Sequence, residues 1–431
     1  MSGKVLAVIL YGRHVANLEQ GKGGQPTLTY IDTTAATPVS LSMPVAPATY
    51  TQRQVRPFLE GLLPDRQDTR AAMGREFGVS GANSFALLAN VGLDCAGAVQ
   101  FCPPSDVADV LARKGTLVRL TRRQIAHRLA ALRVDPTAGW RAPRERWSLA
   151  GAQAKFALRR QDGHWCEATG SEATSHIIKP GVDGLRHQAL NEHVCLATAA
   201  AVGLRAARST FTDFDGEPAL VVERYDRRRD AQGHLLRLHQ EDACQALSVR
   251  PADKYESDGG PRAATIVRLL ANQSDTANRA ANIDDFLAYL AFSYLTMAPD
   301  AHAKNYSMLL LAGQVRVAPL YDVASAAPYD VDEQPGLRSA AMAIGGVKEF
   351  GRVRHVHWVR LADETGLDAG QVVARVRGLA ESIPDAMADV FRTVADIDGA
   401  DELRDRMLPR ISHLCASTTA ELNRPAPDRV H

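Results

Sequence analysis

Apolar and polar residues alternate in short runs along the first hundred residues of this 431-residue chain. Lys4–Leu10 and Leu28–Ile31 have the length and the apolar content of strands, whereas Gln54–Leu63 and Ser84–Val91 have apolar residues at helical spacing. This mixture predicts an N-terminal α/β subdomain over residues 1–105.

The pattern changes twice over the next part of the chain. Residues 106–146 hold one predicted helix, Arg122–Leu132, and a basic, proline-containing stretch, Arg141–Arg146, so we assign them to a helical connector and linker. Residues 147–238 return to strand-like runs and form a predicted β-rich part. The elements expected there are the strands Phe156–Arg160, His164–Glu167, Ser175–Lys179, Ala207–Phe214 and Ala219–Arg224, a tight turn at Asp162-Gly163, and the helix His187–Val202.

Most of residues 239–424 has helical spacing, with one exception. Tyr306–Leu311 and Val315–Ala318 predict a hairpin inside this helical part, and residues 425–431 a loose tail. Strands first and helices afterwards is the order expected of a protein kinase with two lobes. We therefore predict an α+β, bilobal protein-kinase-like fold, with the mixed N-terminal subdomain in front and a largely helical C-terminal lobe.

Composition and charge narrow the class of protein. Hydrophobic residues make up 45% of the chain and charged residues 23%, as in ordinary globular proteins. The net charge of +1 provides no electrostatic footprint for nucleic acid, so autonomous DNA binding is not expected. The six cysteines form no CxxC pair, which argues against a zinc site or a disulfide framework, and the apolar run Val5–Leu10 is too short to span a membrane. We expect a cytoplasmic protein without membrane contact.

The strongest candidate chemistry lies in the segment Asp300–Asn305, which is followed by Asp322 in a short turn. Phosphoryl transfer needs a carboxylate near the attacking hydroxyl and oxygen ligands for Mg²⁺. Asp300 suits the role of catalytic base. Asn305 and Asp322 suit the Mg²⁺ site, because this ion prefers hard oxygen ligands. An N-cap Asp followed by an unrelated turn Asp is the alternative interpretation.

Two further side chains of this segment are candidates. Lys304 is suited to neutralise charge that develops on the transferred phosphoryl group, so we group it with Asp300 as catalytic. His302 is suited to orient a phosphate of ATP or Asp300, although a hydrogen bond from its ring to the loop backbone is the expectation that we prefer.

A loop of small residues just before a predicted strand indicates a phosphate-binding segment, because small residues let backbone amides approach phosphate oxygens. The loop is not a Walker A sequence, and a tight turn without a ligand is the alternative. Its candidate residues are Ala150, Gly151, Ala152, Gln153 and Lys155. Ser148 stands directly before them, where a phosphate would eject the loop or block nucleotide binding. An exposed or capping serine is the alternative for Ser148.

Four more residues are assigned to the nucleotide by their order along the chain. Lys179 ends a predicted strand and Glu192 lies in the next helix, which is the arrangement with which kinases hold the α- and β-phosphates. The backbone from Glu223 to Tyr225 leaves a strand, where its N–H and C=O groups are suited to pair with the adenine edge. A solvated lysine at a strand end is the alternative for Lys179.

The order of these motifs resembles the HipA toxin kinases, over nearly the whole chain. Ala154 and the run Pro299–Ala301 depart from the family's usual residues without removing a catalytic group. The motifs that carry the resemblance are Ser-Leu-Ala-Gly-Ala-Gln-Ala-Lys (148–155), His-Ile-Ile-Lys (176–179), Val-Glu-Arg-Tyr-Asp-Arg (222–227), Lys-Tyr-Glu-Ser-Asp-Gly-Gly-Pro (254–261), Asp-Ala-His-Ala-Lys-Asn (300–305), Leu-Tyr-Asp-Val-Ala-Ser-Ala (320–326), and in the N-terminal part Pro-Val-Ser-Leu-Ser-Met-Pro (38–44), Phe-Leu-Glu-Gly-Leu-Leu-Pro-Asp (58–65) and Asp-Cys-Ala-Gly-Ala-Val (94–99).

The resemblance implies a serine/threonine kinase that uses ATP and Mg²⁺ and acts as the toxin of a type II toxin–antitoxin pair. It implies a helix-turn-helix antitoxin, HipB, which carries the kinase on operator DNA, and an aminoacyl-tRNA synthetase as substrate, notably glutamyl-tRNA synthetase. Blocking tRNA charging would stall translation and favour growth arrest and persistence. By position, Asp300 becomes the base, Asn305 and Asp322 the Mg²⁺ ligands, Lys179 the phosphate lysine and Ser148 the inactivating autophosphorylation site.

Two other functions stay open at this point. A small-molecule phosphotransferase of the antibiotic-kinase type uses the same catalytic set of one Asp, one Asn and a second Asp. Such an enzyme, however, needs no N-terminal subdomain of a hundred residues. A catalytically silent co-repressor that acts only with a DNA-binding antitoxin is the third possibility, and the presence of all the required polar groups argues against it.

Overall fold

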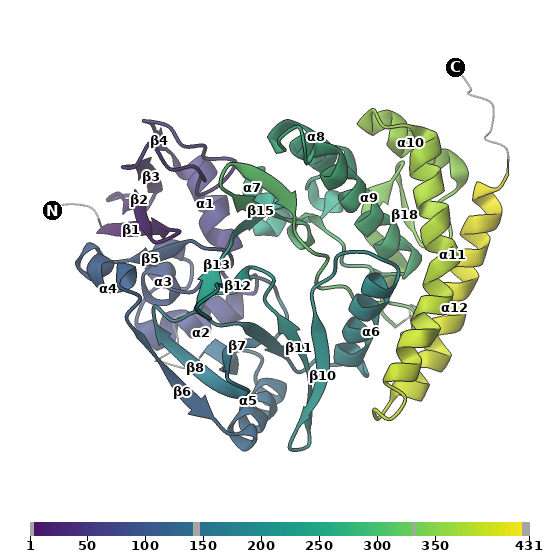
Figure 1. Cartoon of the computed structure of the whole chain (residues 1–431), viewed down its shortest axis with the longest axis horizontal. Coiled ribbons are helices and arrows are strands. Elements are labelled where there is room, and N and C mark those ends of the chain that lie inside the picture. Colours follow the sequence, from purple (N-terminus) through teal and green to yellow (C-terminus); the bar gives the residue numbers. More distant parts are fainter. Residues whose placement is uncertain (1–3, 141–146, 331–332, 425–431) are drawn as a thin grey trace. The chain divides into compact units, whose positions relative to one another are not determined.

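The computed structural model describes residues 4–140, 147–330 and 333–424, so the predicted linker 141–146 and the predicted tail 425–431 lie outside the described residues. The chain divides into two compact units (Figure 1). The first comprises Met1–Asp183, Thr210–Ala252 and Ser307–Arg316, and the second comprises Gly184–Ser209, Asp253–Tyr306 and Val317–His431. The domain boundaries drawn from the sequence at residues 105, 146 and 238 remain predictions.

The N-terminal part of the first unit is a five-stranded antiparallel sheet with helices. The strand order is β4-β3-β2-β1-β5. The strands are β1 (Lys4–Leu10), β2 (Arg13–Gln20), β3 (Pro26–Tyr30), β4 (Thr49–Tyr50) and β5 (Gln100–Cys102), and the helices are α1 (Gln52–Gly61), α2 (Gln67–Phe77), α3 (Ser84–Val91) and α4 (Val107–Leu111). This arrangement agrees with the mixed α/β composition predicted for the segment.

A six-stranded sheet forms the other large element of the first unit, with the order β10-β11-β9-β7-β8-β6. Asp162 and Gly163, which join β7 to β8, both have positive φ, as the predicted tight turn requires. The elements are β6 (Gly115–Leu120), β7 (Phe156–Gln161), β8 (His164–Gly170), β9 (His176–Lys179), β10 (Ser209–Phe214), β11 (Glu217–Glu223) and α5 (Arg122–Val134).

The predicted hairpin near residue 310 forms, but it belongs to the first unit and not to the helical one. Its strands β15 (Ser307–Leu311) and β16 (Gln314–Val317) make a three-stranded sheet with β14 (His239–Asp242), in the order β14-β15-β16. The spacing of apolar residues could not reveal this, because the partner strand is remote in sequence. The remaining elements here are β12 (Arg227–Arg229), β13 (Leu235–Arg237) and α7 (Ala243–Ala246).

The second unit is mainly helical. In Figure 1 its long C-terminal helices α11 and α12 run side by side, and α11 also packs against α6, α9 and α10. The elements are α6 (Gln188–Ala201), α8 (Ala263–Gln273), α9 (Arg279–Leu295), α10 (His355–Thr365), α11 (Ala369–Thr393), α12 (Ala400–Leu422), β17 (Ser339–Ile344) and β18 (Val347–Glu349). The mixture of helices and sheets confirms the predicted α+β class.

The elements that escaped the sequence analysis include β2, α2 and β6. The expectation of a single hairpin within residues 239–424 was wrong, since β14, β17 and β18 also lie there, and short strands of three to six residues show little alternation. The edge strand β6 has no buried residue on either face, so no alternation of apolar and polar positions marks it. It is recognisable only through its antiparallel pairing with β8.

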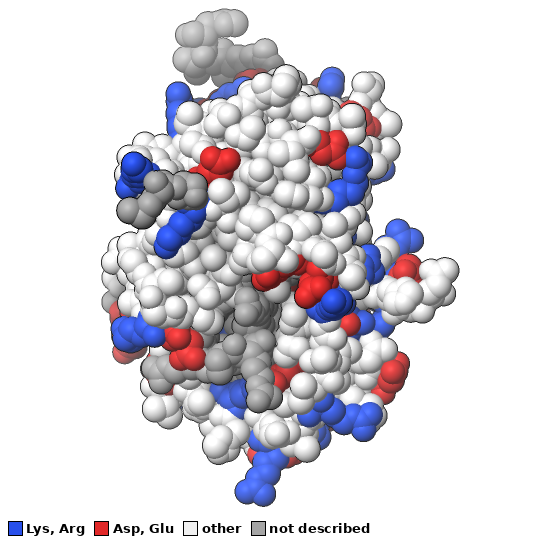
Figure 2. Space-filling model, turned by 90° about the vertical axis from the view of Figure 1, so that its left-hand side faces the viewer, with Lys and Arg blue, Asp and Glu red and all other residues white. Residues whose placement is uncertain are grey.

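Two observations concern membrane-spanning helices and the distribution of surface charge. No helix among the described residues is long and apolar enough to cross a bilayer. On the face of the molecule drawn in Figure 2, Lys and Arg side chains are interspersed with Asp and Glu side chains among uncharged residues.

A buried network of five charged side chains lies at the centre of the first unit. Asp94 accepts from Arg227 Nη2 at 2.8 Å and from Arg237 Nε at 3.1 Å, and Asp226 accepts from Arg224 Nη2 at 2.8 Å. Burial by itself would raise the pKa of Asp94, but the three guanidinium groups outweigh it and hold that pKa far below its usual range. Asp94 is therefore ionised at neutral pH.

We expect Asp94→Asn to lower the free energy of unfolding by about 3–5 kcal/mol, because it leaves three buried cations with one carboxylate. Urea denaturation followed by tryptophan fluorescence measures the change. Asp109→Asn is the matched control, since the Asp109–Lys114 pair is solvent-exposed on both sides and exposed pairs contribute little. Equal midpoints for the two variants would show that the network does not stabilise the fold.

A second buried acid, Glu241, is arranged to hold a proton. Its side chain is 1% exposed, with Ser40 Oγ 2.6 Å from Oε2 and the Leu41 amide donating to Oε1 at 2.7 Å. Burial outweighs these two contacts and raises the pKa of Glu241 to about 8. An acid whose pKa is higher in the folded than in the unfolded state stabilises the fold below its unfolded pKa, and this contribution is lost as the pH rises through about 8.

The wild-type protein should therefore lose about 3 kcal/mol more unfolding free energy between pH 6 and pH 9 than Glu241→Gln, whose neutral amide has no proton to lose. Denaturation midpoints measured at both pH values give the difference. Glu19→Gln, at an exposed position, controls for removal of a carboxylate and should follow the wild type. Parallel pH curves for wild type and Glu241→Gln would contradict the assignment.

Candidate functional site

The segment Asp300–Asn305 follows helix α9 in the second unit, and hydrogen bonds to its backbone carbonyls fix its conformation. The Asn305 side chain donates from Nδ2 to the Asp300 carbonyl at 2.6 Å, and the His302 amide donates to the same carbonyl at 2.9 Å. The Tyr321 hydroxyl donates to the Lys304 carbonyl at 2.7 Å. These bonds give a short segment, whose last three residues form the 3-10 helix Ala303–Asn305, one defined shape.

Asp300, Asn305 and Asp322 line one small cavity. Its volume is about 10 Å³, which is about the space of one water molecule. The side chain of Asp300 is 57% exposed, whereas Asn305 is buried at 9%. Asp322 has a φ of +58°, in the left-handed region that Asp tolerates better than most residues. The structure thus brings together the three residues that sequence order selected.

The donor chemistry of this cavity fits a magnesium ion. With Nδ2 of Asn305 donating to Asp300, its Oδ1 is left to act as a ligand beside the carboxylate of Asp322. No group of three or more His, Cys, Asp or Glu suited to a metal occurs among the described residues. Two protein ligands suffice for Mg²⁺, which keeps several waters and takes further oxygens from the phosphates of its substrate.

The ring of His302 is buried in this segment, and within the described residues its Nδ1 has no hydrogen-bond partner. The expected bond from the ring to the loop backbone remains a prediction. Nε2 lies 3.6 Å from Asp300 Oδ1, and burial lowers the pKa of the imidazole, so the ring is neutral at neutral pH. Lys304 is also buried, at 6% exposure.

Asn191 is a positioning residue that the sequence analysis missed. It lies in α6, is fully buried, and donates from Nδ2 to the Ser325 carbonyl at 2.7 Å while its Oδ1 accepts from the Ser325 amide at 2.9 Å. The Asn191 side chain thus bonds to both the amide and the carbonyl of Ser325, three residues after Asp322, and fixes the backbone there. One asparagine in a helix carries no sequence signal for such a role, since its partner is remote in the chain.

The small-residue loop lies in the first unit and packs against the N-terminal part. Gly151 has a φ of +100° and bridges to Pro64, and its carbonyl accepts from the Asp65 amide at 3.1 Å. Lys155 Nζ donates to the Ala150 carbonyl at 2.9 Å, which closes the loop on itself. The Lys155 side chain would meet a Cβ at position 151, so glycine suits both the backbone angle and the space.

Ser148, immediately before this loop, is completely buried. Its hydroxyl donates to the Leu62 carbonyl at 2.7 Å, and its amide donates to the Asp94 carbonyl at 3.0 Å. In this conformation the hydroxyl is inaccessible to any phosphate donor.

The remaining nucleotide candidates are placed in both units. Lys179 ends β9 in the first unit and is 5% exposed, and Glu192 lies in α6 of the second unit and is 1% exposed. Glu223 ends β11 opposite His176, and the Tyr225 hydroxyl bonds to the side chain of Gln240. Their roles toward ATP remain predictions.

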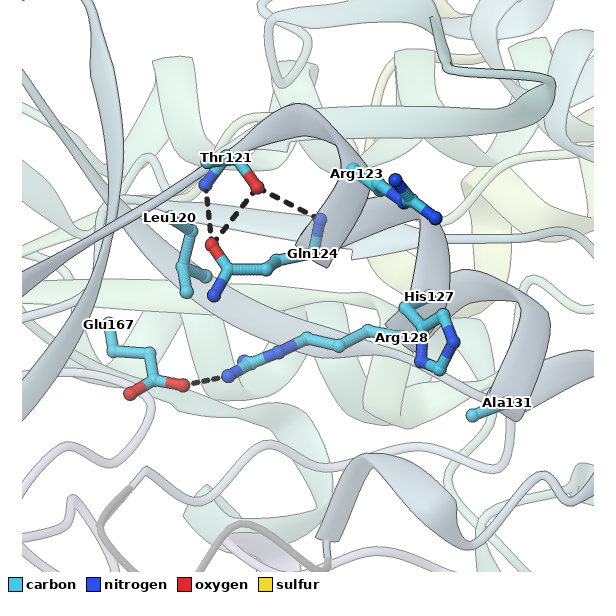
Figure 3. Close-up of a pocket in the computed structure, with 8 residues that line it drawn as sticks. All are labelled: Leu120, Thr121, Arg123, Gln124, His127, Arg128, Ala131 and Glu167. Atoms are coloured by element: carbon cyan, nitrogen blue, oxygen red, sulfur yellow. Dashed lines mark hydrogen bonds and ion pairs between the residues drawn. The ribbon is translucent and has the colours of Figure 1, made fainter.

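A larger cavity of about 490 Å³ lies beside α5 and contains none of these residues (Figure 3). Thr121 caps α5 through Gln124, and Arg128 extends along the cavity to Glu167. Its size alone does not make it a site, since Arg128 and Glu167 already satisfy each other.

The chain matches two family models, the HipA-like C-terminal domain over residues 147–387 and the HipA N-terminal domain over residues 6–102. The serine/threonine-protein kinase toxin HipA of Shewanella oneidensis is 30% identical over 377 residues, which cover 84% of this chain and 82% of that protein. Y4mE of Sinorhizobium fredii, which is named as a kinase, is 36% identical over 407 residues, covering 92% of this chain and 94% of that protein.

A solved structure extends this likeness to the fold. The HipA chain of the Shewanella oneidensis complex of HipA, HipB and operator DNA superposes with a TM-score of 0.80 at 26% identity, covering 97% of this chain and 96% of that chain. The predicted kinase-like fold is thereby confirmed. Both domain models, the relatives and this structure agree, and the chain belongs to the HipA family of kinase toxins.

Proposed function

We propose that this chain is an ATP- and Mg²⁺-dependent serine/threonine protein kinase. The observation that carries the proposal is the single cavity lined by Asp300, Asn305 and Asp322. Phosphoryl transfer is catalysed mainly by positioning and by charge stabilisation, and these three side chains supply a base and two hard ligands in one place. The exposed carboxylate of Asp300 is accessible to a substrate hydroxyl, whereas Asn305 is buried and fixed.

The roles follow from this placement. Asp300 accepts the proton of the attacking serine or threonine hydroxyl. Asn305 and Asp322 hold Mg²⁺, which when bound bridges the phosphates of ATP and neutralises their charge. Lys304 adds positive charge near the transferred phosphoryl group, and His302 supports the segment. We assign the phosphates of the same nucleotide to the loop Ala150–Lys155 and to Lys179, with Glu192 as the carboxylate that pairs with this lysine. We assign the adenine edge to the backbone between Glu223 and Tyr225.

The biological role proposed here is that of a toxin in a two-component module. The solved relative was crystallised with HipB and operator DNA, which supports a helix-turn-helix antitoxin as partner and contact with DNA mainly through that antitoxin. We propose an aminoacyl-tRNA synthetase as the substrate, glutamyl-tRNA synthetase first, in the cytoplasm. Its phosphorylation would halt translation and promote growth arrest and persistence.

We expect Asp300→Ala to lower the rate of phosphate transfer at least 100-fold, because a general base contributes about 10²–10⁴-fold. We expect a loss of at least about 100-fold for Asp322→Ala too, because it removes a proposed ligand of the Mg²⁺ that neutralises the phosphates. Transfer from ATP to the chain itself and to glutamyl-tRNA synthetase is followed by intact mass and peptide mapping. The exposed Asp396→Ala is the control for loss of a carboxylate in the same unit and should keep the wild-type rate.

A folded Asp322→Ala protein with a near-wild-type rate would overturn the metal assignment. A wild-type protein that binds ATP without transferring phosphate, after phosphatase treatment, would favour the co-repressor function. Turnover confined to small alcohols or aminoglycosides would favour the small-molecule phosphotransferase.

Autophosphorylation at Ser148 would switch the enzyme off. The buried Ser148 hydroxyl is bonded to Leu62, so a phosphate there, with almost two negative charges, cannot be accommodated at this position. The segment would have to leave its place between Leu62 and Asp94, and the adjacent loop Ala150–Lys155 would leave with it. Ejection of the loop would remove the backbone amides proposed for the phosphates of ATP.

Ser148→Ala should therefore keep its activity during preincubation with Mg²⁺ and ATP, whereas the wild type should lose most of its activity. The variant gives up one hydrogen bond, at a cost of about 0.5–1.5 kcal/mol, and should remain folded. Ser42→Ala, which removes another hydroxyl that donates to a carbonyl, should be silenced like the wild type. Mapping the principal phosphate to any other residue would refute this role for Ser148.

A further inference from the structure

The motif Lys254–Pro261 supports the resemblance to the family but has no role in the chemistry described so far. In the structure it is a tightly closed segment that contains the short 3-10 helix Glu256–Asp258. Glu256 accepts from the Ala343 amide at 2.7 Å and from Arg262 Nε at 3.2 Å, which ties the loop to two neighbouring segments. A Cβ at Gly260 would lie 2.2 Å from the Asp253 carbonyl oxygen, so the loop closes tightly only with glycine there.

This loop presents Tyr255 to the catalytic segment. The Tyr255 hydroxyl donates to Asp300 Oδ1 at 2.7 Å. Its ring meets the His302 ring edge to face, with centroids 4.9 Å apart and planes at 76°. His302 Nε2 lies 3.6 Å from the same Oδ1. Tyr255 and His302 thus converge on one oxygen of Asp300 and leave the other oxygen, Oδ2, without either of them.

The division between the two oxygens matters because Asp300 is more than half exposed. An exposed carboxylate rotates freely unless a donor holds it, whereas a general base must face the substrate hydroxyl at about 2.6–3.2 Å. His302 is buried and neutral, so it adds no charge that would hold the carboxylate. The phenol of Tyr255 is the donor that fixes the rotation.

We propose that Tyr255 is the positioning residue of Asp300: its hydroxyl anchors Oδ1 and directs Oδ2 toward the acceptor hydroxyl. The proposal rests on the proposed role of Asp300 as the base. It gives the motif Lys254–Pro261 a function, namely to hold a phenol rigidly at the catalytic carboxylate.

The test uses the full-length protein and Tyr255→Phe, which removes the hydroxyl and keeps the ring against His302. We expect the rate of phosphate transfer at saturating ATP to fall about 10- to 100-fold, since loss of alignment is costly for a positioned base. The dissociation constant for ATP, measured by calorimetry, should stay within about 2-fold, because positioning affects the transfer step and not nucleotide binding. Tyr30→Phe is the matched control, since it removes a buried hydroxyl that donates to the Met43 carbonyl at the same 2.7 Å.

A second readout does not depend on activity. Hydrogen exchange of the Asp300–Asn305 amides should be faster in Tyr255→Phe than in the wild type and unchanged in Tyr30→Phe. Together the readouts separate two failures: an inactive wild type defeats the proposed function, and the exchange result still decides whether Tyr255 holds the segment. Wild-type rates and wild-type exchange in Tyr255→Phe would overturn the positioning role. A faster Tyr255→Phe enzyme would also overturn it, since the phenol would then be blocking the base.

Discussion

The buried charge network around Asp94 is the interaction on which the first unit depends. Five ionised side chains are withdrawn from water, and such a set is tolerable only when every charge has partners. Arg224 donates to the Cys95 carbonyl and to Asp226, Arg227 to the Gly97 carbonyl and to Asp94, and Arg237 to Asp94. Asp94 reaches its arginines only when the N-terminal part packs against the segment Arg224–Arg237, which follows β11 and includes the β12-β13 pair. The network therefore couples the folding of the N-terminal part to that of this segment.

The same residue also places the small-residue loop. The Asp94 carboxylate forms ion pairs with three arginines. Its backbone carbonyl accepts a hydrogen bond from the Ser148 amide, and its backbone forms a β-bridge with Trp147. The loop proposed for the phosphates of ATP therefore starts from a point that the charge network fixes. The phosphate that we propose on Ser148 would be introduced at this point, where the serine hydroxyl is buried against the Leu62 carbonyl.

In the second unit, the segment around Asp300 is held in place by a different kind of contact. Neutral side chains contribute to the shape of the segment Asp300–Asn305, because they bond to its backbone or to one oxygen of a carboxylate. Asn191 holds the backbone after Asp322, Tyr321 holds that of Lys304, and Tyr255 holds the side chain of Asp300. Neutral donors restrain these groups without adding charge of their own next to the site that we propose for Mg²⁺ and ATP.

Much of this protein could be predicted from its sequence, and the limit has a physical reason. The α+β class, the turn at Asp162-Gly163 and the selection of Asp300, Asn305 and Asp322 depend on local spacing and on the chemistry of residue types, which a sequence displays directly. Asp94, Asn191 and Tyr255 act through partners that are remote in the chain, and the hairpin strand β15 pairs with β14, so only the tertiary structure could assign them. The run Val222–Arg227 shows both what a sequence reveals and what it does not. Its exit from a strand was predicted correctly, because β11 ends at Glu223. The burial of Arg224, Asp226 and Arg227 in one network with Asp94 was decided by packing.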